Sequence, residues 1–282
     1  MINMQIFRLR SLEDYKRHVE LNRKNYDIMK QQEDSLTRKG KKVFTVRGIS
    51  YPANEYVDFK ADYLYSDGIN INWRERLVCP VTGLNNRVRS CIHILDLELT
   101  PYPDSVIYVT EQVTPLFTFL QKKFQNLLGS EYLGDDKMPG SLHNDIRHED
   151  MTKLSFATES LDYYLSFECF EHIPEYKKAI PEIYRTLKTD GIFLGSFPFD
   201  RNVYDNFIRA KMDEKGNIIH LAEPEYHGDP VSEKGILCYT VFGWEMLDEF
   251  RQCGFKDVYL VLLWSSMFGY LGGEQVLFIA KK

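Results

Sequence analysis

The feature that most constrains this chain is the alternation of strand-like and helix-like segments from about residue 103 onward. Apolar and β-branched runs predict strands at 105–109, 130–134, 146–148, 161–167, 192–199, 258–264 and 274–280. Helical patterns are expected at 115–127, 174–188 and 244–253. Such alternation is typical of a mostly parallel sheet with helices on both faces. A short glycine-containing loop between the last two runs predicts a C-terminal antiparallel hairpin.

The N-terminal part of the chain has a different pattern. Ser11 precedes Leu12 and is followed three residues later by Asp14, a variant of the capping box that predicts the start of a helix. Residues 43–95 are expected to form short strands and loops with little periodicity. The sequence therefore predicts a helical plus small-β segment over residues 1–95 and an α/β domain over residues 96–282.

Composition excludes several classes of function. The chain has 282 residues and a formal net charge of -6, so it has no general electrostatic reason to bind nucleic acid. Neither a signal peptide nor an apolar run long enough to span a membrane is expected. The five cysteines are odd in number and scattered, which indicates reduced thiols and a cytoplasmic protein. The oligomeric state is left open.

Acidic residues follow the first four predicted strands of the α/β domain. In a parallel sheet a ligand binds beyond the carboxyl ends of the strands, near the point where the strand order reverses. Four carboxylates there suit a ligand with hydroxyl and amino groups, and they would repel a phosphate. The residues are Glu111, Glu131, Asp150 and Glu168.

The segment IRHEDMTKLSFATESLDYYLSFECFEHIPEYKKAIPEIYRTLKTDGIFLGSFPF carries a family resemblance. It resembles the third-to-fifth-strand region of class I S-adenosylmethionine (SAM)-dependent methyltransferases, mainly through FEHIP and LKTDG. The resemblance covers about residues 105–282 and implies a Rossmann-like fold with SAM as the cofactor. It also implies that Glu131 binds the ribose hydroxyls. Asp150 and the Met151 backbone would bind the adenine edge, and Ser166 and Glu168 would line the methionine end.

One segment departs from the family pattern. TEQVTPL stands where the family usually has a glycine-rich loop after the first strand. It is similar to the TE.vTPL…SEYLG arrangement of a subset of methyltransferase-like proteins. We expect Glu111 and Thr114 to replace the glycine loop and Tyr132 to lie against the adenosine.

Two histidines are the candidate catalytic residues. His227 lies in EYHGDP, in the loop after the fifth strand that also holds Asp229, and this loop usually contacts the acceptor in such a fold. An imidazole with a pKa near 6.5 can take a hydroxyl proton at neutral pH. The alternative is a histidine that caps a turn. His172, in EHIP, is the second candidate, although a structural role is the more common one for it.

Two short turns resemble the knuckles of a zinc ribbon. Ser50 and Ala53 bound the first turn, and Cys79 and Thr82 bound the second, so three of four expected cysteines are missing. Because a tetrahedral zinc site needs four ligands, no metal is expected there or elsewhere in the chain. The alternative is that CPVTG is an ordinary turn.

These observations predict a SAM-dependent methyltransferase, with O-methylation of a small molecule or sugar derivative as the reaction. The alternative is a catalytically inactive methyltransferase-like binding or scaffold protein. A Rossmann-type oxidoreductase is disfavoured, because no G-x-G-x-x-G follows a predicted strand.

Overall fold

The computed structural model describes residues 4–38, 40–228 and 235–282. Two compact units divide the chain. Unit 1 contains the chain up to Leu9, Glu13–Pro101 and Leu260–Leu277. Unit 2 contains Arg10–Leu12, Tyr102–Tyr259 and Phe278–Lys282.

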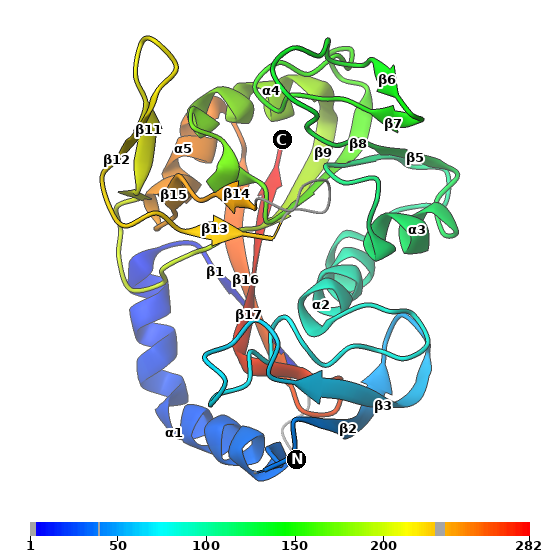
Figure 1. The fold of residues 1–282 in the computed structure, drawn as a ribbon, viewed down its shortest axis with the longest axis vertical. Coiled ribbons are helices and arrows are strands. Elements are labelled where there is room, and N and C mark those ends of the chain that lie inside the picture. The colour runs from blue at the N-terminus through cyan, green and yellow to red at the C-terminus, as the bar shows by residue number, and fades with distance from the viewer. Residues whose placement is uncertain (1–3, 39, 229–234) are drawn as a thin grey trace. The chain divides into compact units, whose positions relative to one another are not determined.

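The main sheet has the strand order β1-β16-β17-β9-β8-β4-β5. β4, β5, β8 and β9 are mutually parallel along this order, whereas β17 is antiparallel to β9 and β1 is antiparallel to β16. The bounds are β1 (Gln5–Leu9), β4 (Val106–Val109), β5 (Asn126–Gly129), β8 (Leu161–Phe167), β9 (Leu187–Ser196), β16 (Asp257–Ser265) and β17 (Tyr270–Lys281). The predicted α/β class with a parallel centre and an antiparallel C-terminal pair is confirmed (Figure 1).

The strand order reverses direction at β4. Ile107 in β4 is paired with Leu127 of β5 on one side and with Tyr163 of β8 on the other. The chain therefore continues to one side of β4 first and returns on its other side. A crevice beyond the carboxyl ends of the strands is expected at such a switch point.

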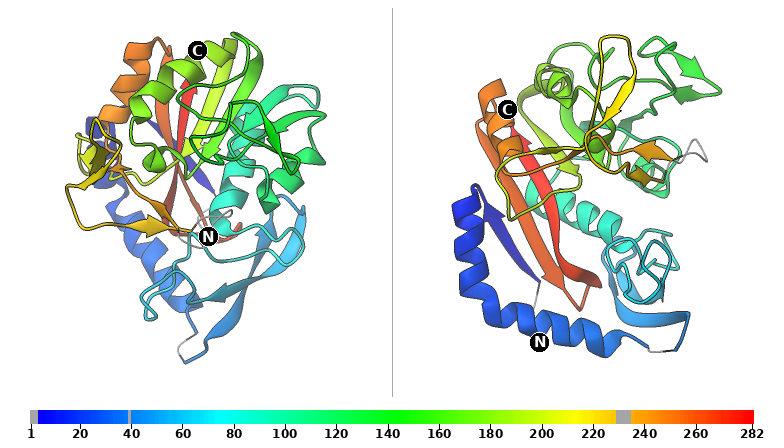
Figure 2. Two further views of the ribbon diagram at one scale, coloured as in Figure 1. Left: turned by 45° about the horizontal axis from the view of Figure 1, so that its top comes forward. Right: turned by 60° about the vertical axis from the view of Figure 1, so that its left-hand side comes forward.

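Among the described residues, five helical segments and several two-stranded sheets complete unit 2. α4 and α5 contact each other beside the sheet, and the β11–β12 hairpin projects as a thin loop (Figures 1 and 2). The helical segments are α3 (Pro115–Gln121), η2 (Phe170–His172), η3 (Tyr176–Lys178), α4 (Ala179–Thr186) and α5 (Glu245–Cys253). The short strands form the two-stranded sheets β6–β7, β10–β15, β11–β12 and β13–β14. Their bounds are β6 (Leu142–His143), β7 (Ile146–Arg147), β10 (Phe207–Ile208), β11 (Ala210–Met212), β12 (Ile218–His220), β13 (Tyr226–His227), β14 (Ile236–Leu237) and β15 (Thr240–Val241).

Aromatic side chains form much of the core of unit 2. Phe193 in β9 lies with its ring centroid 5.3 Å from Phe250 of α5 and 5.7 Å from Phe170 of η2. Phe250 also lies 4.7 Å from Phe278 of β17. All four rings are fully buried or nearly so, and each large ring removed from water contributes strongly to stability. This cluster ties η2, which directly follows β8, to the sheet.

Unit 1 contains α1 (Leu12–Leu36), β2 (Val43–Ser50), β3 (Glu55–Asp62), α2 (Asn86–Ile94) and η1 (Leu95–Leu99). The helix predicted from Leu12 is confirmed as α1. The expectation of little periodicity over 43–95 was wrong. β2 alternates between exposed and buried residues, and its buried Phe44 and Val46 pack in the core of unit 1.

The helix α2 was also missed in the sequence. Asn85 caps it by accepting a hydrogen bond from the Val88 backbone N–H at 2.9 Å. Seven of its nine residues are buried, among them the polar Asn86 and Arg89. Because polar residues lie on its buried side, the sequence shows no apolar stripe.

The two turns that resemble the knuckles of a zinc ribbon both lie in unit 1. Ser50 ends β2 at the tip of the β2–β3 hairpin, and Cys79 begins the second turn, in which the Gly83 N–H donates to the Cys79 carbonyl at 2.9 Å. The Cys79 thiol is buried. Burial by itself raises its pKa, but hydrogen bonds from Ser50 and Thr82 lower that pKa below the usual value. Serine, threonine and cysteine thus meet where a zinc ribbon would have thiolates.

Several predicted boundaries in unit 2 were wrong. The second strand was expected at 130–134, but β5 ends at Gly129 because α3 stops at Gln121. The third strand, β7, pairs only with β6 and lies outside the main sheet. α4 begins at Ala179, so Pro181 lies in its first turn, where a missing N–H loses no helical hydrogen bond.

Among the described residues, no helix is both long enough and apolar enough to cross a membrane. All five cysteines are free, as expected for reduced thiols.

Candidate functional site

Three of the four predicted acidic residues follow adjacent parallel strands. Glu111 follows β4, Glu131 follows β5 and Glu168 follows β8. Because β5, β4 and β8 are neighbours and parallel, these residues lie at one edge of the sheet. This edge includes the switch point at β4, where the fold is expected to bind a ligand.

The Glu131 carboxylate organises the loop that replaces the glycine-rich segment. Its Oε1 accepts hydrogen bonds from the backbone N–H groups of Gln112 at 2.7 Å and Val113 at 3.0 Å. The residue is largely buried. The glycine in this region is Gly129 in β5, where an added Cβ would lie 2.8 Å from the Glu111 carbonyl. The close approach of backbone therefore occurs between β5 and the start of the loop, with the glycine on the β5 side.

Glu111 and Thr114 interact with each other at the start of α3. The Thr114 hydroxyl accepts from the Phe117 N–H at 3.3 Å as an N-cap, and it donates to the Glu111 carboxylate. Both residues are thus held beside the switch point. Their contact with a cofactor stays a prediction.

The remaining predicted cofactor residues occupy different environments. Asp150 Oδ1 accepts from the Thr152 N–H and hydroxyl, both at 2.8 Å, which fixes the turn after β7. Met151 and Ser166 are buried, with the Ser166 hydroxyl 4.0 Å from the methionine sulfur. Tyr132 is exposed, and its hydroxyl donates to Asp135. The parallel bridge between Glu131 and His148 brings the Asp150 turn to the end of β5.

Glu168 has an unusual backbone conformation at the end of β8. Its φ is 54°, in the left-handed region that few non-glycine residues occupy. Its N–H donates to the Ser196 carbonyl at 2.7 Å, and the Ser196 hydroxyl donates to its carboxylate at 2.8 Å. Residues held in such conformations cluster at functional sites.

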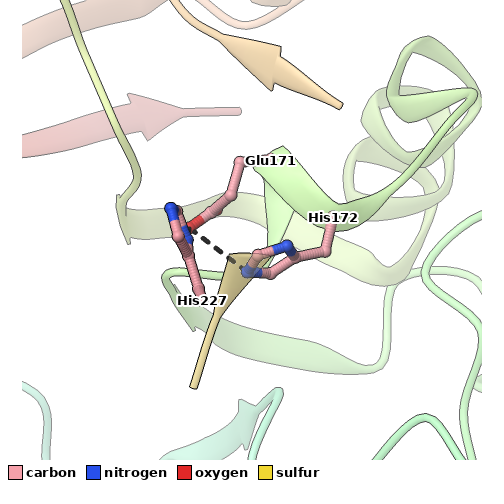
Figure 3. Close-up of side chains that lie close together, drawn as sticks. All are labelled: Glu171, His172 and His227. Carbon is pink, nitrogen blue, oxygen red and sulfur yellow. Dashed lines mark ion pairs between the residues drawn. The ribbon is translucent and has the colours of Figure 1, made fainter. Parts of the chain in front are cut away.

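A cluster of one carboxylate and two imidazoles lies directly after this turn. Glu171 and His172 come from η2, and His227 comes from β13 (Figure 3). Phe170, which is fully buried in the aromatic core, anchors η2. The Tyr239 N–H also donates to the Glu171 carbonyl at 2.6 Å. The backbone on which Glu171 and His172 stand is therefore fixed from two sides.

The short strand β14 holds both histidines. β13 pairs with it, placing His227 opposite Ile236. The Leu237 carbonyl of the same strand accepts a hydrogen bond from His172 Nδ1 at 2.9 Å. As a result the two rings lie 5.0 Å apart in an edge-to-face arrangement, on either side of Glu171.

Electrostatics in this cluster are unusual. The Glu171 side chain is fully buried, and burial raises the pKa of its carboxyl group. The Glu171 carboxylate raises the pKa of His227 to about 9 in spite of partial burial, and Glu225 adds to this effect. Without another bound charge, His227 is mostly protonated at neutral pH. The predicted role of His227 as a base thus requires loss of a tightly held proton.

Glu171 was missed by the sequence analysis, although its neighbours Glu168 and His172 were named. The adjacent residues Glu171 and His172 were the signal available in the sequence. His227, which completes the cluster, lies 55 residues after His172 on another element. We predicted no metal because three cysteines are missing from the turns that resemble a zinc ribbon. The Glu171–His172–His227 cluster contains no cysteine, so that argument does not apply to it. Asp229 lies outside the described residues.

Comparison with known families gives one match. Residues 125–195 match the family model described as a methyltransferase domain. The matched segment runs from β5 to β9 and contains Glu131, Asp150, Glu168, Glu171 and His172. The match agrees with the methyltransferase domain expected from the sequence and covers about a quarter of the chain.

Solved structures resemble the chain weakly. A SAM-dependent methyltransferase of Listeria monocytogenes, described as putative, has 14% identity and a TM-score of 0.41, covering 70% of this chain and 98% of its own. The 1,6-didemethyltoxoflavin-N1-methyltransferase of Burkholderia thailandensis has 17% identity and a TM-score of 0.38, covering 70% and 78%. No curated protein sequence matches. Similarity at this level supports no conclusion about substrate or mechanism.

The site residues suit SAM in their chemistry. Glu111, Glu131 and Glu168 supply carboxylates at three neighbouring strand ends, which match a ribose diol, an ammonium group and a cationic sulfur. Glu131 Oε1 already accepts hydrogen bonds from two loop amides, so a ribose diol would bind this carboxylate in addition to them. The carboxylate therefore has a structural role in the loop whatever its role toward the cofactor.

Proposed function

We propose that this protein methylates a hydroxyl oxygen of a small molecule or sugar derivative, using the edge of the sheet beyond β5, β4 and β8. The observation that carries the proposal is the row of carboxylates that follow these adjacent strands. Glu171 and His172 of the Glu171–His172–His227 cluster come directly after the last of these carboxylates in the sequence. One group can hold the methyl donor, and the other can receive the acceptor.

On the cofactor side, each residue has a distinct task. When bound, SAM supplies a methyl group on a positively charged sulfur. Glu131 would accept hydrogen bonds from the ribose hydroxyls, and Asp150 with the Met151 backbone would bind the adenine edge. Glu168, fixed by Ser196, would place a negative charge near the methionine end. Much of the rate in such a transfer comes from holding donor and acceptor in line.

On the acceptor side, His227 and His172 face a buried carboxylate. Their positions at the end of η2 and on β13 suit a hydroxyl group that must lose its proton as the new bond forms. With a pKa of about 9, the free His227 imidazolium would bind and orient an acceptor oxygen before it could act as a base. We place the protein in the cytoplasm on the strength of its free cysteines.

Calorimetry and a transfer assay test the proposal. We expect SAM and S-adenosylhomocysteine to bind with one site per chain, and NAD to show no binding. Incubation with methyl-labelled SAM and a fractionated metabolite extract should then yield a labelled product whose methyl group is on oxygen. Absence of binding to both SAM and S-adenosylhomocysteine would overturn the proposal. Binding without any transfer would favour the inactive binding protein, and a label on nitrogen or carbon would refute O-methylation.

A further inference from the structure

We propose that Glu171, His172 and His227 bind a divalent transition-metal ion. The three side chains offer one carboxylate oxygen and two imidazole nitrogens, all within 4.8 Å of one another. They come from two separate elements and converge on one point (Figure 3). The proposal does not depend on methyl transfer, because ion binding is measured without SAM.

The distances in the cluster fit an ion better than direct hydrogen bonds. Glu171 Oε1 lies 3.5 Å from His227 Nδ1 and 3.6 Å from His172 Nε2. A contact of 3.6 Å is too long for a hydrogen bond. Ligand atoms about 2.1 Å from a tetrahedral zinc ion are roughly 3.4 Å apart, which is close to the two separations between Glu171 and the histidine nitrogens.

The Glu171 carboxyl group is buried and is not held by close hydrogen bonds from the described residues. The Glu171 side chain is fully buried, and neither of its oxygens has a hydrogen-bond partner among the residues described. The basic groups facing it are His227 and His172, at 3.5 and 3.6 Å, and buried charges are usually paired more closely or bound to a metal. Glu168 is close enough to act on Glu171 as a second negative charge, which increases the need for a cation.

Each histidine has its other ring nitrogen turned to an oxygen atom. His172 Nδ1 lies 2.9 Å from the Leu237 carbonyl and therefore carries the proton, so Nε2 presents its lone pair toward Glu171. A lone pair facing a carboxylate requires a proton or a cation between them. His227 Nε2 lies 3.2 Å from Glu225. Metal-binding histidines almost always donate their second nitrogen to a carbonyl or carboxylate in this way.

The ligand types indicate the class of ion. Two imidazoles favour zinc, iron, cobalt or nickel over magnesium and calcium, which prefer oxygen ligands. Three protein ligands leave at least one coordination position for another oxygen, as in catalytic zinc sites. An acceptor hydroxyl could occupy that position.

The experiment uses the full chain after chelator treatment and dialysis. We expect zinc chloride to bind with one site per chain in calorimetry, and magnesium chloride to bind far more weakly. Cobalt chloride should give visible absorption bands that report nitrogen and oxygen ligands. Glu171→Gln and His227→Ala should each remove the zinc isotherm and the cobalt bands, while circular dichroism shows that the variants are folded.

Two further variants make the result specific. Glu225→Gln, which weakens the contact to His227 Nε2 and also the ion pair with Arg209, should lower zinc affinity by about 10- to 100-fold. His220→Ala is the control, since His220 is exposed on β12 and belongs to no cluster. Failure of the wild-type chain to bind zinc, or equal binding by Glu171→Gln and wild type, would overturn the proposal. So would an equal loss in His220→Ala, because the ion would then not be held by this cluster.

Discussion

Two places in the molecule look like metal sites for opposite reasons. The turn at Cys79 in unit 1 resembles a zinc knuckle in its sequence, but serine and threonine stand beside its only cysteine. The cluster at Glu171 in unit 2 has no sequence motif, yet it gathers three ligand atoms. Among the described residues, the buried atom without a hydrogen-bond partner is the neutral Ser50 hydroxyl in the first place, and in the second place both oxygens of the Glu171 carboxyl group lack one. A buried carboxyl group costs more to leave without a partner than a buried hydroxyl, which makes the Glu171 cluster the stronger candidate for binding a cation.

The largest expected effect concerns His227. His227→Ala should lower turnover on the order of 10²–10⁴-fold, the usual cost of removing a group that assists proton transfer. SAM affinity should change little, because His227 belongs to the acceptor side. Initial rates with labelled SAM and calorimetry with SAM measure the two quantities separately. The control His220→Ala should retain wild-type values, and unchanged turnover in His227→Ala would reduce that residue to a turn histidine.

The next effect concerns Glu131. Glu131→Ala should weaken SAM binding by about 2–4 kcal/mol, or roughly 30- to 1000-fold in Kd. Part of the loss comes from the loop, because the Gln112 and Val113 amides lose their acceptor. Glu131→Gln should lose less, since an amide oxygen can still accept from these N–H groups.

Calorimetry with SAM measures the affinities, and amide hydrogen exchange at Gln112 and Val113 reports the order of the loop. Wild-type SAM affinity in folded Glu131→Ala would contradict the assignment of the cofactor site. Fast exchange together with unchanged affinity would leave Glu131 a purely structural role.

A third prediction contrasts the histidines of the two units. His93 is buried, stacks on Tyr51 at 3.7 Å and is 3.0 Å from the Tyr270 hydroxyl. Burial lowers its pKa to about 4, whereas the neighbouring carboxylate raises that of His227 to about 9. The unfolded chain, with a histidine pKa near 6.5, thus takes up a proton first as the pH falls. The stabilisation from neutral His93 is complete above pH 6.5 and is lost as the pH falls toward 4, by up to about 3 kcal/mol.

Urea unfolding followed by tryptophan fluorescence measures this effect, since Trp73 and Trp264 both lie in unit 1. His93→Gln should be less stable at neutral pH and should lose less stability between pH 6.5 and pH 4 than the wild type. An identical pH dependence in both proteins would show that His93 is not the group responsible.

Sequence reasoning found the sheet and the strand ends because these depend on local patterns. The run at 161–167 is β8 as predicted, and the helix predicted at 244–253 is α5 from Glu245. Sequence reasoning failed where polar residues are buried, as at Arg89 in α2. It also failed where a short apolar run fits either a helix or a strand, as at Leu127. The His227–Glu171 contact could not be predicted, because β14 creates it from segments distant in sequence.

The smallest expected effect concerns the knuckle itself. Cys79→Ser should lower the free energy of unfolding by about 1–2 kcal/mol, because a buried thiol is replaced by a smaller and more polar hydroxyl. Ser50 and Thr82 can still hydrogen-bond to the new hydroxyl, which limits the loss. Zinc content after reconstitution should equal that of the wild type, since the proposed ligands lie elsewhere. Thermal unfolding and elemental analysis measure both quantities in one preparation. If Cys79→Ser lost the ion and His227→Ala retained it, the comparison would be reversed. The turn at Cys79 would then be the metal site, and Glu171 would be a buried structural carboxylate.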